Sequence, residues 1–200
     1  LLQASGSEEW TYDLGERALS ESPADSLIAE EFVKSAVRLH RAEAAEGVLN
    51  RAIDRAPDAA VFIARALLYW NTDRAALALE SLEAASKLDE RASRAYLLAA
   101  EIQSAAGNLQ PMRKLIGLAL VLNPRNAEAL GLAAEAELKD NRLEPAFRLA
   151  EGALGIDPAE SRALEVRALA LAQLGRLADA RNAFLRPIAA APEASATRSN

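Results

Sequence analysis

The stretch that decides the fold runs from residue 123 to residue 158 as NPRNAEALGLAAEAELKDNRLEPAFRLAEGALGIDP and continues from 159 to 192 as AESRALEVRALALAQLGRLADARNAFLRPIAAAP. Pro124, Pro158 and Pro192 are evenly spaced, because 158 − 124 and 192 − 158 both equal 34. Between successive prolines lie two segments with apolar residues at helical spacing, separated by a polar turn. A fixed period of this length indicates a repeat protein.

The same period continues upstream of this stretch. Pro57 follows Pro23 by 57 − 23 = 34 residues, whereas Pro124 follows Pro57 by 124 − 57 = 67, one short of two periods. We place the missing residue in the loop near Pro57, because loops tolerate length changes at little cost. A chain that reverses between two helices often needs a residue with positive φ, which Gly, Asn and Asp tolerate. The equivalent turn positions are His40, Asp73, Gly107, Asn141 and Gly175.

The pattern predicts five helix pairs preceded by a single helix. The expected repeats are about 26–57, 59–90, 93–124, 127–158 and 161–192. Their helices are expected at 26–39, 42–55, 59–71, 75–88, 92–106, 110–122, 126–139, 143–155, 160–174 and 178–190. Residues 1–22 are expected to begin loosely, up to residue 6, and then to form one helix with Trp10, Leu14 and Ala18 at helical spacing. This helix either caps the array or is the second half of an earlier repeat. Residues 193–200 are expected to be a disordered tail.

The composition favours an all-α protein. Hydrophobic residues make up 51% of the chain and aromatic residues only 4%. Most of the hydrophobic residues are Ala and Leu, which are the strongest helix formers and let helices pack closely. Strand-forming residues are too scattered to build a sheet.

The charge and the cysteine count limit the partners. A formal net charge of −6 disfavours nucleic acid, which requires clustered Lys and Arg. There are no cysteines, so disulfides and thiolate chemistry are absent, which fits a bacterial cytoplasm or periplasm equally well. No apolar run reaches the ~18 residues that a membrane span needs. The chain begins without Met, so we expect a fragment or a processed form, whose further segments are unknown.

The sequence carries no recognisable catalytic or cofactor site. His40 is the only histidine and lies in a turn, where a solvated role is favoured over catalysis. Glu8-Glu9 and Glu30-Glu31 are interpreted as solvated helix faces rather than catalytic pairs. No spacing of His, Cys, Asp and Glu suits a metal, and no Gly-rich loop could hold a phosphate. We therefore expect no enzyme activity, no metal and no cofactor.

Laid over one another, the five repeats resemble the tetratricopeptide repeat (TPR). In that pattern the first helix has a small residue where the second crosses it, and the second carries an Ala, a large residue and another Ala before the closing Pro. The small position holds Val33, Ala66, Ala100, Ala134 and Ala168. The first Ala position holds Ala45, Ala78, Met112, Ala146 and Ala180. The large position holds Leu49, Leu82, Ile116, Ala150 and Phe184, and the closing Ala position holds Ala52, Ala85, Ala119 and Ala153.

Two departures from the family pattern change what we expect. The position usually held by Tyr keeps only Tyr69, so the aromatic layers should be thin. Pro187 stands where the last repeat should have its second Ala. Because Pro breaks a helix interior, the last helix should kink or stop near Arg186 and end the array.

The resemblance implies a right-handed superhelical solenoid of antiparallel helix pairs that binds protein partners. In this family the first helices line a concave groove, where extended peptides or helices lie. Residues of those helices that face away from their own partner helix should be exposed in the groove. The predicted groove residues are Lys34, Ile63, Leu67, Trp70, Asn71, Leu97, Glu101, Glu128, Glu135 and Glu165, with Glu30, Val37, Ser104, Leu138, Leu169 and Gln173 beside them.

The predicted groove combines an apolar patch with an acidic row. Ile63, Leu67, Trp70 and Leu97 form the patch, and Glu101, Glu128, Glu135 and Glu165 form the row. We hypothesise that Trp70 anchors an apolar side chain of the partner while the glutamates favour basic residues beside it. The alternatives are that Trp70 packs under the neighbouring repeat and that the glutamates are a solvated face. The family's carboxylate-clamping version is disfavoured, because its candidates Lys34, Asn71 and Arg94 do not recur in adjacent repeats.

Three functions remain open from the sequence. The first is a non-enzymatic scaffold that binds a partner peptide, helix or domain. The Ala-, Arg- and Glu-rich composition suggests a bacterial source, and bacterial proteins of this kind often serve secretion, export or envelope assembly, which is an analogy only. The second is a docking or regulatory region of a longer enzyme or membrane protein. The third is a scaffold that assembles with further copies of itself.

Overall fold

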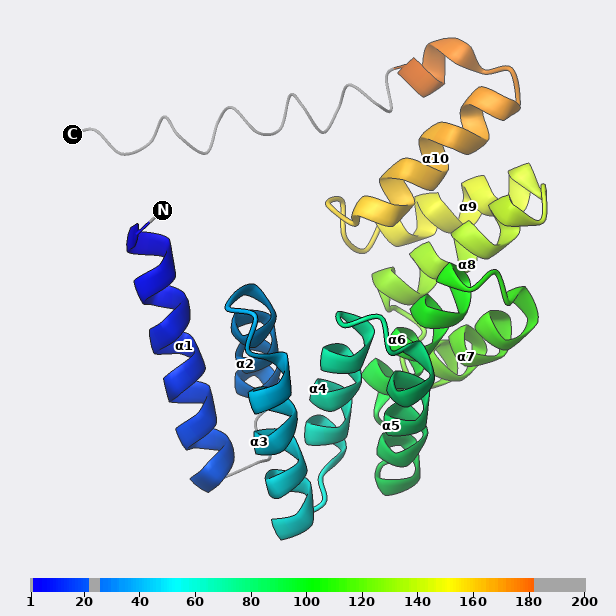
Figure 1. Cartoon of the computed structure of the whole chain (residues 1–200). Coiled ribbons are helices and arrows are strands. Elements are labelled where there is room, and N and C mark those ends of the chain that lie inside the picture. The colour runs from blue at the N-terminus through cyan, green and yellow to red at the C-terminus, as the bar shows by residue number, and fades with distance from the viewer. Residues whose placement is uncertain (1, 22–25, 182–200) are drawn as a thin grey trace. The chain divides into compact units, whose positions relative to one another are not determined.

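The computed structural model describes residues 2–21 and 26–181 of the 200-residue chain, with the side chains from residue 6 onward. Every regular element in these ranges is a helix (Figure 1). The chain divides into two compact units, Leu1–Ile102 and Gln103–Asn200, each of which has its own core. The all-α fold predicted from the sequence is confirmed.

The helices follow the predicted pairs closely. The first unit contains α1 (Leu2–Glu21), α2 (Ser26–Arg38), α3 (Ala42–Arg55), α4 (Ala59–Trp70), α5 (Ala75–Leu88) and most of α6 (Ser93–Ala105). The second contains the end of α6, then α7 (Leu109–Leu122), α8 (Ala127–Lys139), α9 (Leu143–Leu154) and α10 (Ser161–Gln173). A further helical segment is described over 177–181. The predicted stop near Arg186, the large position at Phe184 and the tail 193–200 lie outside the described residues.

Helix α1 differs from the prediction in its start and in its buried face. It begins at Leu2 rather than Ser7, so residues 2–6 are helical and not loose. It packs on α2 and α3 through Tyr12 and Leu19, while Trp10 is 67% exposed. Gly15 determines which side of α1 packs on α2, because a Cβ there would lie 2.7 Å from the Cβ of Phe32. Only glycine lets α2 approach so closely, and the Tyr12 and Phe32 rings then meet with centroids 4.9 Å apart.

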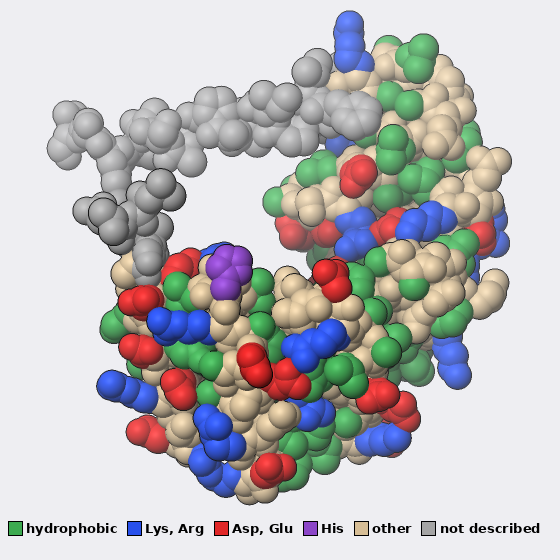
Figure 2. Space-filling model, in the orientation of Figure 1, with side chains coloured by type: hydrophobic (Ala, Val, Ile, Leu, Met, Phe, Trp, Pro, Cys, Tyr) green, Lys and Arg blue, Asp and Glu red, His purple; other side chains and the backbone are tan. Residues whose placement is uncertain are grey.

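The turn chemistry predicted from the sequence is confirmed. All five equivalent turn residues have positive φ, with values of 56° at His40, 57° at Asp73 and Asn141, 74° at Gly107 and 76° at Gly175. His40 is exposed, as a solvated turn residue should be (purple in Figure 2). The missing residue also lies where we placed it, because the loop between α3 and α4 covers 56–58, whereas that between α5 and α6 covers 89–92.

The small residues lie where helices of a pair cross. The predicted crossing positions are all buried, and four of the five are Ala with no exposed surface. The described residues at the predicted Ala and large positions of the second helices are buried as well. A methyl group at the crossing keeps paired helices close, which is why the Ala-rich composition is compatible with a packed core. Helices α4 and α5, and likewise α8 and α9, pack together in this way.

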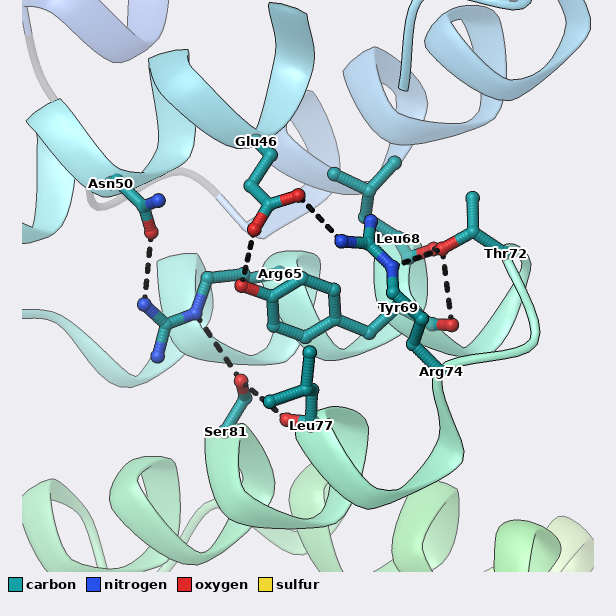
Figure 3. A network of polar contacts seen from close by, with 9 residues as sticks. All are labelled: Glu46, Asn50, Arg65, Leu68, Tyr69, Thr72, Arg74, Leu77 and Ser81. Atoms are coloured by element: carbon teal, nitrogen blue, oxygen red, sulfur yellow. Dashed lines mark hydrogen bonds and ion pairs between the residues drawn. The ribbon is translucent and has the colours of Figure 1, made fainter. Parts of the chain in front are cut away.

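A polar network around Tyr69 joins the first two repeats (Figure 3). Tyr69 of α4 donates to Glu46 of α3, and Arg74 of the following turn lies 2.7 Å from the same carboxylate. The Arg74 guanidinium also lies 4.5 Å from the centre of the Tyr69 ring. Arg65 donates to Asn50 at 3.0 Å. The network therefore fixes α3 against the next helix pair.

The same positions carry different chemistry in the second unit. Where repeat 1 has Glu46, repeat 3 has Arg113, which forms an ion pair with Glu137 of α8. Glu137 in turn lies 2.6 Å from Arg142, the equivalent of Arg74. One repeat later the position of Arg113 is filled by Phe147, whose ring centre lies 5.4 Å from the guanidinium of the next turn's arginine. Successive repeats are thus joined by matched but dissimilar groups.

Candidate functional site

The predicted groove residues differ widely in exposure. Lys34, Asn71 and Glu165 are exposed, whereas Leu67, Trp70, Glu101, Glu128 and Glu135 are partly exposed. They also fall into two different compact units. The first unit holds Lys34, Ile63, Leu67, Trp70, Asn71, Leu97 and Glu101, and the second holds Glu128, Glu135 and Glu165.

Two residues of the predicted apolar patch are not exposed. Ile63 is only 6% exposed and Leu97 only 2%. The expectation considered only the partner helix within each pair, but first helices of adjacent pairs also pack on one another, as α2 and α4 do. A residue turned away from its own partner helix can therefore be covered by the neighbouring first helix. The continuous apolar patch expected around Trp70 is corrected accordingly.

Ile63 instead lines a hollow in the first unit of about 460 Å³. Its walls come from the beginnings of α2, α4 and α6 and the end of α5. Glu30 of α2 and Arg94 of α6 both line it, and Arg94 Nε lies 3.6 Å from Glu30 Oε1. An ion pair between α2 and α6 therefore forms part of the lining of this hollow.

Trp70 lies at the last residue of α4, away from the residues that line this hollow. It is partly exposed. Leu67, one turn earlier, packs against the core of the first unit. Asn71 caps the helix end, and its side-chain amide donates to the Leu67 carbonyl at 2.8 Å. That Trp70 contacts a partner protein therefore stays a prediction.

A second hollow, also of about 460 Å³, lies between α8 and α10. Its apolar part is made by Leu138, Val166 and Leu169, of which Val166 is buried and Leu169 is 37% exposed. Its polar lining is made by Glu135, Lys139, Ser161, Arg162 and Glu165. This hollow brings together four residues predicted for the inner face, two glutamates and two leucines.

Helices α8 and α10 are held close by a glycine and a cap. Glu160 caps α10, and its side chain accepts from the N–H of Arg162 and Ala163. The same carboxylate lies over Gly131 of α8, where a Cβ would come within 2.6 Å of Glu160 Oε2. Because Gly131 has no side chain, the beginning of α10 can lie directly on α8.

Glu135 is the centre of an ion-pair network at the edge of this hollow. Ser104 Oγ donates to Glu135 Oε1 at 2.7 Å, and Lys139 Nζ lies 2.8 Å from the same oxygen. Arg162 donates to the other oxygen, Oε2. Burial by itself would raise the pKa of Glu135, but the hydrogen bonds from Lys139, Ser104 and Arg162 outweigh it and lower the pKa to about 2. Glu135 is therefore a paired structural anion.

The predicted acidic row is corrected by these contacts. Glu135 is neutralised by two cations, and both Glu101 and Glu128 also have interaction partners. Glu165 is exposed, and no ion pair joins it to another described residue. Sequence reasoning missed Lys139 and Arg162, although Lys139 follows Glu135 by four residues, a spacing that places both on one helix face.

The described part of the chain contains neither a group of metal-ligating residues nor a membrane-spanning helix. No group of three or more His, Cys, Asp and Glu residues in 2–21 and 26–181 could hold a metal ion. None of the helices described is long and apolar enough to cross a membrane.

Solved structures share this arrangement of helix pairs. TTC0263, a thermophilic TPR protein of Thermus thermophilus, superimposes with a TM-score of 0.65 at 22% identity, covering 85% of this chain and 93% of that one. A tetratricopeptide repeat protein of Parabacteroides merdae superimposes with a TM-score of 0.68 at 16% identity, and the match covers 94% of this chain and 80% of that one. MamA superimposes with a TM-score of 0.64 at 18% identity, and the match covers 76% of this chain and 90% of that one. No protein-family model and no curated protein matches the sequence.

The class of protein follows from the fold and the repeat pattern together. Helix pairs, positive-φ turns and buried small crossing positions recur along the described chain. The similar structures are TPR proteins, at identities that show the fold alone. The chain has the tetratricopeptide-repeat fold.

Proposed function

We propose that this chain is a non-enzymatic scaffold that binds a protein partner in the hollow between α8 and α10. The observation that carries the proposal is the exposed leucine Leu169 beside a preformed polar rim. Binding sites for peptides combine an apolar pocket with a few fixed polar groups. The Glu135 network supplies that rigidity, because it ties α8, α10 and the end of α6 together before any partner arrives.

The partner segment that fits this hollow carries an apolar side chain next to a basic residue. Leu138 and Leu169 offer apolar surface for the first. Glu165 offers a carboxylate for the second, because no other described residue neutralises it. Glu135 is not available for this purpose, since it is already paired. The electrostatic preference therefore rests on one glutamate rather than on a row.

The experiment is selection of binders from a random peptide library on the full chain, followed by affinity measurement on variants. Leu169→Asp is expected to weaken binding by at least tenfold, because truncating or charging an apolar anchor commonly costs about 2 kcal/mol or more. Glu165→Gln should weaken the binding of peptides that carry a basic residue and leave the binding of neutral peptides unchanged. Leu77→Asp is the matched control, because Leu77 is 39% exposed on α5, close to the 37% of Leu169.

Equal binding to wild type and Leu169→Asp, with the helical content of both unchanged, contradicts the proposed site. Loss of binding in Leu77→Asp as well would show that the assay reports general surface charge. Retained preference for basic peptides in Glu165→Gln would contradict the role of that carboxylate.

A second contact surface is proposed in the first unit, around Trp70 with Leu67, Lys34 and Asn71. Its support is the partial exposure of Trp70 at the end of α4. Trp is the residue type most often found at binding hot spots. Trp70→Ala in the same peptide assay is expected to reduce binding of those peptides that Leu169→Asp does not affect. If no selected peptide responds to Trp70→Ala, this second surface is wrong.

The cellular setting is proposed from composition alone. An Ala-, Arg- and Glu-rich helical scaffold without cysteine fits a bacterial secretion, export or envelope-assembly complex. Fractionation of the native cells, with detection of the chain in the envelope fraction and in pull-downs of that complex, is the test. Detection only among free cytoplasmic proteins would contradict it.

A further inference from the structure

The outer face of α7 is almost free of charge. Its exposed residues are Gln110, Pro111, Lys114, Gly117, Leu118, Val121 and Leu122, here called the α7 stripe. Three of them are large apolar residues, with Leu118 41% exposed, Val121 80% and Leu122 39%. The only charged member is Lys114, and no ion pair joins it to another described residue.

The equivalent helices of other repeats do not share this property. Each of them exposes several charged residues, among them Arg51 and Asp54 on α3, Glu83 and Lys87 on α5, and Arg148 and Glu151 on α9. The outer helices of a repeat array normally present charged residues to water. Contiguous exposed apolar residues on one helix indicate an interaction surface.

We propose that the α7 stripe binds the α7 stripe of a second copy of this chain, with the two helices antiparallel. The two helices would be complementary in shape. A Cβ at Gly117 would meet no atom within 4 Å, so the helix surface there is open and carries no side chain beside the exposed Leu118, and this bare position, here called the notch, leaves room for a side chain of a second helix. In an antiparallel pair centred between these two residues, Leu118 of each copy lies opposite Gly117 of the other. Knob and notch are thus supplied by the same helix.

They would also be complementary in charge. In the same pair Lys114 lies opposite Val121 of the other copy, three residues on either side of the Gly117–Leu118 centre. The ammonium then approaches the carboxyl end of the partner helix, where the helix dipole and free carbonyls favour a cation. Pro124 sharpens this effect, because it has no N–H to donate to the carbonyl four residues earlier, that of Leu120.

These two features select a second copy rather than another partner. Both the notch and the cation find their complements on α7 itself, and a two-fold axis satisfies both contacts twice. The interface is small, because a helix of 14 residues is about 21 Å long. It lies below the ~1,200 Å² of stable complexes, so the dimer is expected to form only at roughly 0.1 mM and above, or where copies are concentrated locally.

A dimer of this kind would display two hollows between α8 and α10. If the partner protein carries two suitable segments, binding becomes bivalent and its avidity exceeds the affinity of one hollow. The dimer itself rests only on the α7 stripe. It can therefore hold or fail independently of the function proposed for the hollow.

The first test is light scattering from the full chain across a concentration series. The mass of wild type is expected to rise from the 21.3 kDa of one chain toward twice that value as the concentration approaches ~1 mM. Val121→Glu and Gly117→Leu should both keep the mass of one chain, with helical content unchanged, because each side chain points into open solvent in the monomer. Lys87→Glu, at the position in α5 equivalent to Val121, should dimerise like wild type.

The second test uses the absence of native cysteine to determine orientation. Single substitutions Lys114→Cys and Val121→Cys are mixed under oxidising conditions. An antiparallel pair yields the mixed disulfide in preference to either symmetric one. A wild type that stays monomeric to ~1 mM overturns the proposal. So does loss of association in Lys87→Glu but not in Val121→Glu, and symmetric disulfides in preference to the mixed one overturn the antiparallel arrangement.

Discussion

The hydroxyl of Tyr69 donates a hydrogen bond to Glu46 Oε1 at 2.8 Å, so the first helix of repeat 2 is joined to the second helix of repeat 1. Tyr69 is only 7% exposed, and burial, followed by the bond to Glu46, raises the pKa of its hydroxyl. Burial would also raise the pKa of Glu46, but hydrogen bonds from Arg74 and Tyr69 lower it overall. The bond is therefore donated by a neutral phenol to an ionised carboxylate, which is the stronger type of hydrogen bond.

Tyr69→Phe is expected to destabilise the chain by about 1 kcal/mol, because it removes the donor while Arg74 continues to hold Glu46. Tyr69→Ala should cost about 3–5 kcal/mol, since the buried ring is lost as well. Urea denaturation followed by circular dichroism measures both. Tyr96→Phe is the control, because the Tyr96 hydroxyl makes only an exposed contact of 3.3 Å to the Glu90 carbonyl. Equal losses in the two Phe variants would show that the Glu46 bond adds nothing.

Glu135 predicts a specific dependence of stability on pH. Its pKa is lowered from 4.5 to about 2 in the folded state. A lowered pKa gives stability that is fully present above the unfolded pKa and is lost as the pH falls toward the folded one. The contribution, up to about 3 kcal/mol, should therefore disappear between about pH 4.5 and about pH 2. The difference in unfolding free energy between wild type and Glu135→Gln measures it and should shrink over that range.

The matched control for this measurement is Glu83→Gln. Glu83 pairs with Lys87 at the same spacing of four residues, but its side chain is 66% exposed, against 19% for Glu135. The hydrogen bond from Lys87 lowers the pKa of Glu83 as well, but solvent screens an exposed pair, so the replacement of Glu83 should give a much smaller difference over the same pH range. A difference for Glu135→Gln that is constant from neutral to acid pH would show that packing, not the ion pairs, causes its effect.

The fold could be predicted from the sequence because its determinants are local and recur. Each turn depends on one residue that accepts positive φ, and each helix crossing depends on one small residue. Both kinds of residue recur with the repeat period, so the sequence repeats can be aligned on them. The start of α1 was predicted incorrectly, because α1 belongs to no complete repeat whose helix boundaries could be compared with its own. Its face is decided by Gly15 against Phe32, a contact between two helices that no spacing within α1 reveals.

The candidate site was predicted only in part, because exposure and pairing depend on neighbours in the next repeat. Helical spacing predicted Glu165, Leu138 and Leu169 for the inner faces of their helices, and the structure brings the three together around one hollow. It could not show that the neighbouring first helices leave Ile63 only a trace of exposed surface. Nor could it show that Arg162, in the next repeat, takes up the charge of Glu135. These contacts cross between repeats and depend on side-chain conformation.

Ala134 is expected to tolerate no larger side chain. It has no exposed surface and lies at the crossing position of α8, packed in the core that α8 forms with α9. Ala134→Leu should destabilise the chain by about 1–3 kcal/mol through overpacking. Ala134→Arg should cost more, since a buried cation would have no partner. Ala44→Leu, at an exposed position of α3, is the control and should change stability by less than about 0.5 kcal/mol.

His40→Gly is expected to stabilise the chain, which is unusual for a substitution to glycine. His40 has φ of 56° in a turn where two of the equivalent residues are glycines. A left-handed conformation costs a residue with a Cβ roughly 1 kcal/mol, and glycine avoids this cost. Part of the gain is offset by the greater freedom of glycine in the unfolded chain, so a net gain of about 0.5 kcal/mol is expected. Thermal denaturation of His40→Gly and of His40→Ala measures this effect. His40→Ala keeps the Cβ and should give no gain in stability. A loss of stability in His40→Gly would show that the imidazole makes a favourable contact that outweighs the backbone strain.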